Sequence, residues 1–207
     1  MEGMLNDLSI GLEDAARFEN FCREHPEKTG FNKVEFSVQV LTTGHWPQNA
    51  RFDEINLPLP MQRCVSVFKE YYESKYTSNR RITWTFSLGS ATLRGYFGVM
   101  RKSYDIQVHT LQAVVLLLFN SSTTSKNGSG SEVANEAAAA SLSNSTTMSF
   151  VSIMEALNMP EEVLKKTLHS LSCGKFKVLK KYGTGEAGEK DSVIRVTDSF
   201  AVNDQFS

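Results

Sequence analysis

The 207-residue sequence has few cysteines, no long apolar run and no excess of one charge, and each shortage excludes a class of protein. Its three cysteines are far apart and form no CxxC pair, so we expect no disulfide framework and a reducing compartment, cytoplasmic or nuclear. The longest apolar run, residues 113–119, is too short to span a bilayer. A formal net charge of −1 gives the chain no general attraction to nucleic acid or to a membrane.

Sequence patterns that carry catalytic chemistry are also missing. No GxSxG, P-loop or HExxH pattern occurs. Cys22 and His25 would share a helical face, but no second pair of ligands completes a zinc site. We therefore expect no catalytic residue, no metal and no cofactor. The sequence is nevertheless 41% hydrophobic, which is enough for one or two domains with real cores.

The first half of the chain predicts two amphipathic helices separated by strands. Residues 1–25 place one apolar stripe (Met1, Leu5, Leu8 and Leu12) on a helix. A lone helix of this length needs partners, so we expect the chain to begin inside a larger helical bundle, with this stripe exposed and prone to self-association. A second stripe over residues 61–76 follows two prolines that suit a first helical turn.

Alternating apolar residues predict the strands of this half. One strand is expected at residues 35–41 and another at 81–89, with 91–97 as the hairpin partner of the second. A further strand around 104–108 precedes a helix over residues 111–119.

The second half predicts a winged-helix order interrupted by an insertion. Residues 121–148 are rich in Ser, Thr, Asn, Gly and Ala and indicate a disordered insertion, with a short helix at 132–140. Deleting roughly residues 122–147 should leave folding intact. Ser149 can cap the next helix, and Pro160 can start a third. Strands at residues 176–181 and 192–196 complete the pattern.

The third helix and the wing are locally basic, which raises the alternative of a winged-helix nucleic-acid binder. The basic residues are Lys165, Lys166, Lys175, Lys177, Lys180 and Lys181. However, the helix carries no Arg, Asn or Gln that could read base edges, and acidic residues lie nearby in the sequence. A solvated basic face, or one that meets an acidic protein partner, is favoured over DNA recognition.

Three segments together resemble the C-terminal cullin-homology region. They are residues 36–47 (FSVQVLTTGHWP), 112–120 (QAVVLLLFN) and 168–179 (LHSLSCGKFKVL). Further matches follow in the same order at residues 1–8, 57–58, 68–72, 81–84, 88–89 and 200–206. The resemblance covers nearly the whole chain apart from the insertion and the hairpin around 183–191.

The resemblance implies an α/β (α+β) fold in three parts. Residues 1–30 would be the last helix of a helical bundle, 31–110 an α/β segment with a small, mainly antiparallel sheet, and 111–207 a winged-helix-like segment holding the insertion 121–148. The adaptor-binding repeats, most of the bundle and the terminal winged helix of a cullin would be absent. A fragment of a longer cullin and a truncated cullin-like product, active or degenerate, both fit the sequence.

The resemblance also implies a function without catalysis. The chain would be a scaffold segment of a multisubunit RING ubiquitin ligase, in which the sheet accepts a strand from a RING-box protein that recruits a ubiquitin-conjugating enzyme. Candidate protein-binding residues lie on the two predicted strands and at the tryptophan that follows the first, although core packing explains their apolar character equally well. They are Val38, Val40, Leu41, Trp46, Ile82, Trp84, Phe86 and Leu88.

Overall fold

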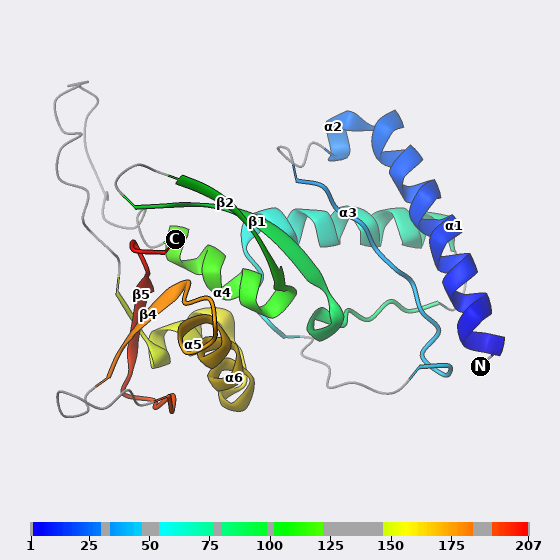
Figure 1. Cartoon of the computed structure of the whole chain (residues 1–207). Helices are drawn as coiled ribbons and strands as arrows, with labels where there is room; N and C mark the ends of the chain where they lie inside the picture. The colour runs from blue at the N-terminus through cyan, green and yellow to red at the C-terminus, as the bar shows by residue number, and fades with distance from the viewer. Residues whose placement is uncertain are drawn as a thin grey trace, which may run out of the picture. The chain divides into compact units, whose positions relative to one another are not determined.

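The computed structural model describes residues 2–29, 34–46, 54–76, 80–98, 102–121, 147–183 and 192–206. Two compact units emerge from its internal contacts, the first comprising Met1–Asp53 and Leu57–Thr85, the second Glu54–Asn56 and Phe86–Ser207. Helices and small antiparallel sheets are mixed along the chain, which confirms the predicted α+β class (Figure 1). The division into a bundle helix, an α/β segment and a winged-helix segment stays a prediction.

The first unit is built from helices α1 (Glu2–Glu24), α2 (Pro26–Thr29) and α3 (Leu59–Lys75). Both long helices were predicted, and α3 begins as expected, with Pro58 at its N-cap and a proline in its first turn. The predicted apolar stripe of α1 includes the exposed Leu5 and Leu12, at 66% and 70% exposure. The buried positions of α1 are instead Asp7, Gly11, Asp14 and Phe18.

Three buried rings form the centre of this unit, and we call Phe18, Phe68 and Tyr72 the aromatic cluster. The rings of Phe18 and Phe68 meet edge-on, with centroids 4.9 Å apart and an interplanar angle of 77°. Edge-to-face contact is favourable for aromatic rings beyond the area that it buries. The aromatic cluster therefore joins α1 to the C-terminal half of α3.

The two strands predicted in this part of the chain are not strands in the structure. The described residues 34–46 and 80–85 contain no strand, and Figure 1 draws them as plain traces. Residues Phe86–Leu88 form a short 3-10 helix, η1, at the end of the second predicted strand. Alternating side chains fix which residues are buried, but a strand also requires a neighbour that pairs with its backbone.

The second unit opens with a hairpin of strands β1 (Ser90–Phe97) and β2 (Lys102–His109). The strands are antiparallel, with Ser90 opposite His109 and Phe97 opposite Lys102. The predicted strand at 104–108 is thus confirmed, whereas the predicted pairing of 91–97 with 81–89 is wrong. Residues 91–97 pair forward along the chain because β2 offers an equally alternating partner.

The remainder of the second unit has the element order of a winged helix. Helix α4 (Thr110–Ser121) is followed by strand β3 (Met148–Ser149), helices α5 (Phe150–Leu157) and α6 (Glu161–Ser172), and strands β4 (Leu179–Tyr182) and β5 (Ser199–Val202). The strands form a sheet in the order β3-β5-β4. Most of the predicted insertion, with its short helix, lies outside the described residues, but Ser121 belongs to α4 and Met148 to β3.

A side-chain cap marks the start of α5, and a proline marks the start of α6. Ser149 accepts a hydrogen bond from the backbone N–H of Ser152 at 3.1 Å, as predicted for the start of α5. Pro160 takes the N-cap of α6, one position earlier than the first-turn position predicted for it. Two glutamates in the first turn of α6 lie at the positive end of the helix dipole.

The predicted strands of the wing are displaced in the structure. The first begins at Leu179 instead of residue 176, and residues 192–195 form no strand. The Asp198 carboxylate accepts the Arg195 backbone N–H at 2.7 Å and closes a turn over residues 196–197. This local bond competes with a ladder, so the strand starts only after the turn, at Ser199.

A short piece of chain from between the helices of the first unit belongs to the second. Ile55 is buried there at 8% exposure. The Asn56 backbone N–H donates to the Leu157 carbonyl at 2.9 Å, and the Asn158 side-chain amide donates to the Glu54 carbonyl at 2.9 Å. These bonds hold residues 54–56 against the end of α5.

Candidate protein-docking surface

Two segments of the first unit lie over the aromatic cluster, and we call residues 34–42 and 80–85 together the docking surface. Val38 and Val40 pack against the cluster from one segment, and Ile82 and Trp84 from the other. The Trp84 ring meets that of Phe68 nearly edge-on, at 5.8 Å between centroids. Four of the predicted binding residues are therefore brought together on one apolar floor.

Burial alternates along both segments. In the first, Val38 and Val40 are half-buried and Gln39 between them is exposed. In the second, Ile82 and Trp84 are half-buried, with exposed residues on either side of Ile82. This is the period of a β-strand with one face on a core. The docking surface thus has the side-chain placement of two strands without a ladder in the described residues.

Helix α1 covers one edge of the first segment. A Cβ added at Gly11 would lie 3.1 Å from the Val40 carbonyl oxygen and 3.9 Å from the Val40 nitrogen. Two residues further on, the Thr42 backbone N–H donates to the Asp7 carboxylate at 2.9 Å. Successive residues of an extended chain direct their backbone groups to opposite edges. The groups of Val40 and Thr42 face α1, so those of Ser37 and Gln39 face the other edge.

A buried carboxylate fastens the turn that follows this segment. Asp7 accepts hydrogen bonds from the Thr42 hydroxyl at 2.8 Å and from the Trp46 indole N–H at 3.0 Å, and its Oδ2 lies 3.2 Å from His45 Nδ1. An added Cβ at Gly3 would meet the His45 ring at 3.0 Å, so a glycine lets this ring lie against α1. We call Asp7, Thr42, His45 and Trp46 the Asp7 clasp.

The hydrogen bonds of the Asp7 clasp outweigh the burial of its carboxylate. Burial by itself raises the pKa of Asp7, but the bonds from Thr42, Trp46 and His45 lower it, and the net pKa falls from 3.8 to about 2. The charged form of Asp7 is therefore the one that holds the turn.

A second buried carboxylate ties α1 to the end of α3. Asp14 Oδ1 lies 2.8 Å from Lys75 Nζ, and the Tyr76 hydroxyl lies 3.1 Å from both Asp14 oxygens. Burial lowers the pKa of Lys75, but the bond and the charge of Asp14 raise it above its ordinary value in sum. The lysine remains protonated against the aspartate.

The other predicted binding residues are distributed differently. Leu41 and Trp46 are half-buried beyond the aromatic cluster, with Trp46 in the Asp7 clasp. Phe86 and Leu88 belong to η1 in the second unit, where Leu88 is 61% exposed. The sequence prediction missed Asp7 and Asp14. Their spacing with Gly11 and Phe18, in steps of four, three and four, is the spacing of a buried helical face and was the available signal.

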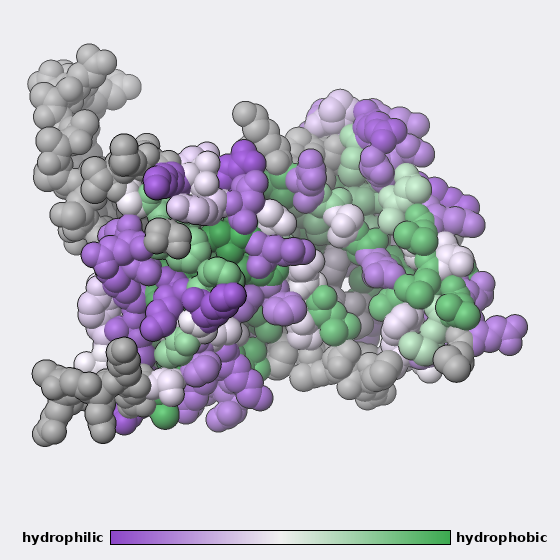
Figure 2. Space-filling model, in the orientation of Figure 1, coloured by the Kyte–Doolittle hydropathy of each residue, from purple (hydrophilic) through white to green (hydrophobic). Residues whose placement is uncertain are grey.

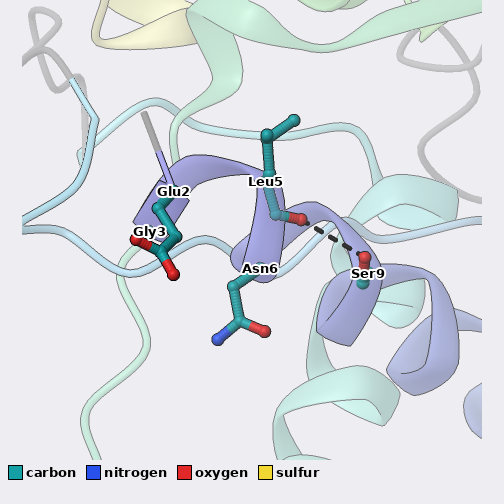
Figure 3. A pocket seen from close by; sticks show the side chains of 5 residues that line it. All are labelled: Glu2, Gly3, Leu5, Asn6 and Ser9. Atoms are coloured by element: carbon teal, nitrogen blue, oxygen red, sulfur yellow. Dashed lines mark hydrogen bonds between the residues drawn. The ribbon is translucent and has the colours of Figure 1, made fainter.

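The described residues hold no candidate metal centre. No three His, Cys, Asp or Glu side chains in this part of the chain gather so that they could hold a metal ion. Figure 3 shows an open pocket at the start of α1. The Ser9 hydroxyl donates to the Leu5 carbonyl there at 3.3 Å, and the side chains of Leu5 and Asn6 point to different sides of the helix. The residues that line it are Glu2, Gly3, Leu5, Asn6 and Ser9. No helix in the described ranges is long and apolar enough to cross a bilayer.

Comparison with known proteins assigns the family. Residues 40–206 match the cullin alpha+beta domain. The chain is 38% identical over 207 residues to Cullin-2 of Arabidopsis thaliana, with 100% of the chain and 23% of that protein covered. It is 34% identical over 200 residues to Cullin-1 of Oryza sativa subsp. japonica, covering 97% of the chain and 23% of that protein.

A third relative carries a different description. The chain is 37% identical over 204 residues to putative cullin-like protein 1 of Arabidopsis thaliana, which covers 98% of the chain and 23% of that protein. The chain thus spans 23% of the length of each of these relatives. The matched residues begin within the first segment of the docking surface and end beyond strand β5. The chain belongs to the cullin family.

Proposed function

We propose that this chain is the part of a cullin-type scaffold that docks a RING-box protein in a multisubunit ubiquitin ligase. The docking surface would accept one strand of the RING-box protein, which in turn recruits the ubiquitin-conjugating enzyme. The chain itself would perform no chemistry and would contribute by holding its partners near each other. This role rests on membership of the cullin family and on the geometry of the first unit.

The observation that carries the proposal is the strand-like burial of two segments that have no ladder. A strand added to the exposed edge of residues 34–42 would pair with the backbone groups of Ser37 and Gln39, because α1 already covers the opposite edge. Pairing of this kind obtains affinity from main-chain hydrogen bonds and specificity from alternate side chains. The half-buried valines and Trp84 would provide the apolar floor for those side chains.

A matched pair of variants tests the pairing without removing the floor. Gln39→Pro removes one backbone donor from the proposed edge, whereas Gln39→Ala removes the same exposed side chain and keeps the donor. We expect Gln39→Ala to bind a purified RING-box protein within about twofold of the unchanged chain, and Gln39→Pro to bind about tenfold more weakly or not at all. Titration calorimetry measures both, and tryptophan fluorescence verifies that each variant is folded.

Two outcomes would count against this function. Equal binding by the proline and alanine variants would place the partner elsewhere on the chain. Binding that falls steeply with salt would indicate a phosphate or charge contact instead, because strand addition depends little on ionic strength.

A further inference from the structure

The loop between α6 and β4 presents an aromatic ring to solvent between two lysines. Phe176 is 66% exposed, and the Lys175 ammonium lies 5.4 Å from the centre of its ring. Lys177 follows directly and is also exposed. A single exposed apolar residue needs no explanation in itself, so the question is whether this loop is held in place.

The loop is fixed at both ends. A Cβ added at Gly174 would lie 2.6 Å from the Ser170 carbonyl oxygen, so the loop starts in close contact with the last turn of α6. At the other end Val178 is buried at 4% exposure. The Asn203 amide donates to the Lys177 carbonyl at 2.7 Å, and the Asn203 backbone N–H donates to the Val178 carbonyl at 2.9 Å. Phe176 is therefore held outward by its own backbone.

Most of the lysines around the loop form no ion pair within the described residues. Of the six lysines from 165 to 181, Lys165 pairs with Glu161 at 2.6 Å and Lys181 with Asp198 at 3.3 Å. In the described part of the chain the other four take part in no ion pair, and Lys180 donates only to an amide, at 3.4 Å. Those four are Lys166, Lys175, Lys177 and Lys180.

Another of these lysines, Lys166, is exposed on α6, the helix that leads into the loop. Lys166 stands one helical turn before Ser170, whose carbonyl is in contact with the start of the loop. Figure 2 shows mostly hydrophilic side chains over α6 on the face in view. Glu162, one helical turn before Lys166, forms no ion pair in the described structure. The described residues thus place one exposed ring between two lysines of its own loop, with a third exposed lysine on the preceding helix.

We propose that Lys166, Lys175, Phe176 and Lys177, which we call the basic aromatic surface, dock an acidic protein segment. Carboxylates of the segment would lie against the lysines, and an apolar side chain would cover the Phe176 ring. Protein is favoured over nucleic acid because α6 and the loop contain no Arg, Asn or Gln for base recognition, and their one Phe is accompanied by no Tyr or Trp for base stacking. This surface belongs to the second unit and is separate from the docking surface of the first.

The test uses two labelled probes of similar charge, a short peptide of glutamates around one central leucine and a single-stranded oligonucleotide. Fluorescence anisotropy at low salt measures binding of each to the full chain. The double variant Lys175→Ala/Lys177→Ala should weaken peptide binding about 3- to 10-fold, and Phe176→Ser about threefold. The matched control Lys165→Ala, whose lysine already has a partner, should change it less than about twofold. Circular dichroism confirms that each variant is folded.

Other outcomes would overturn the proposal. Peptide binding that is absent, or that falls equally in Lys165→Ala and in the double variant, would show no specific surface. Tighter binding of the oligonucleotide than of the peptide, lost in the same double variant, would make the partner a nucleic acid. Unchanged peptide binding by Phe176→Ser, with loss in the double variant, would refute the apolar part of the surface.

Discussion

Replacing Phe68 by alanine removes the ring on which the docking surface depends. Phe68 is 1% exposed, and its ring lies 4.9 Å from that of Phe18 and 5.8 Å from that of Trp84. The variant therefore leaves a cavity beneath the second segment of the docking surface and separates α3 from α1. Leu59→Ala is the matched control, because Leu59 belongs to the same helix and is 69% exposed.

The expected loss is large relative to the stability of a small unit. A buried Phe→Ala substitution costs about 3–5 kcal/mol, since both transfer energy and cavity energy are lost. Domains are typically stable by only about 5–15 kcal/mol, and a unit of this size loses about 4–8 °C in Tm per kcal/mol. We expect Phe68→Ala to lower the Tm of the first unit by on the order of 20 °C. The control should stay within about 0.5 kcal/mol of the unchanged chain.

Tryptophan fluorescence during urea titration reports the unfolding of the first unit selectively. The chain has 2 tryptophans, and both Trp46 and Trp84 belong to the first unit. Their emission should report a lowered urea midpoint for Phe68→Ala, with RING-box binding reduced in parallel. If Phe68→Ala and Leu59→Ala shift the midpoint equally, the aromatic cluster is not the centre of the unit and the reasoning fails.

Three further changes have definite expected results. The pKa of Asp7 is about 2 in the folded chain and 3.8 ordinarily, so its ionised form stabilises the fold above about pH 4, and this contribution is lost as the pH falls towards 2. Asp7→Asn should therefore lower the urea midpoint at pH 7 and flatten the pH dependence of that midpoint between pH 4 and 2. Gly11→Leu should lower the same midpoint, since its Cβ would meet the Val40 carbonyl at 3.1 Å, whereas Ala16→Leu at an exposed position of α1 should not. Ser149→Ala should cost about 0.5–2 kcal/mol in thermal unfolding followed by circular dichroism, and Ser149→Asp should restore most of it; equal loss in both would mean that the cap does not hold α5.

Helices were predictable here because each has its own signal in the sequence. The stripe that includes Phe68, the prolines before α3 and the cap at Ser149 are all local, and all lie where the sequence placed them. Strand pairing was not predictable from the same information. Residues 81–89 alternate as convincingly as 91–97, but among the described residues only the second segment has a partner strand.

The candidate docking surface was predicted in part. The four residues of the apolar floor were predicted because aromatic and branched residues at alternate positions indicate a half-buried segment. They are Val38, Val40, Ile82 and Trp84. Asp7 was missed because an acidic residue on a helix is ordinarily read as solvent-exposed. Its burial depends on donors from residues 42–46, which lie far along the chain and which helical periodicity cannot identify.

The bonds of residues 54–56 to the end of α5 have a consequence for synthesis on the ribosome. The Asn56 side-chain amide donates to the Ala156 carbonyl at 3.0 Å across a separation of 100 residues. At about 5–20 residues per second, α5 is completed roughly 5–20 s after residues 54–56 have been made. During that interval the carbonyls of Ala156 and Leu157 that hold Asn56 do not yet exist, although α1 and most of α3 can already pack together. Residues 54–56 therefore remain without these bonds until α5 has been made, and a chaperone that binds short apolar segments would meet Ile55 there.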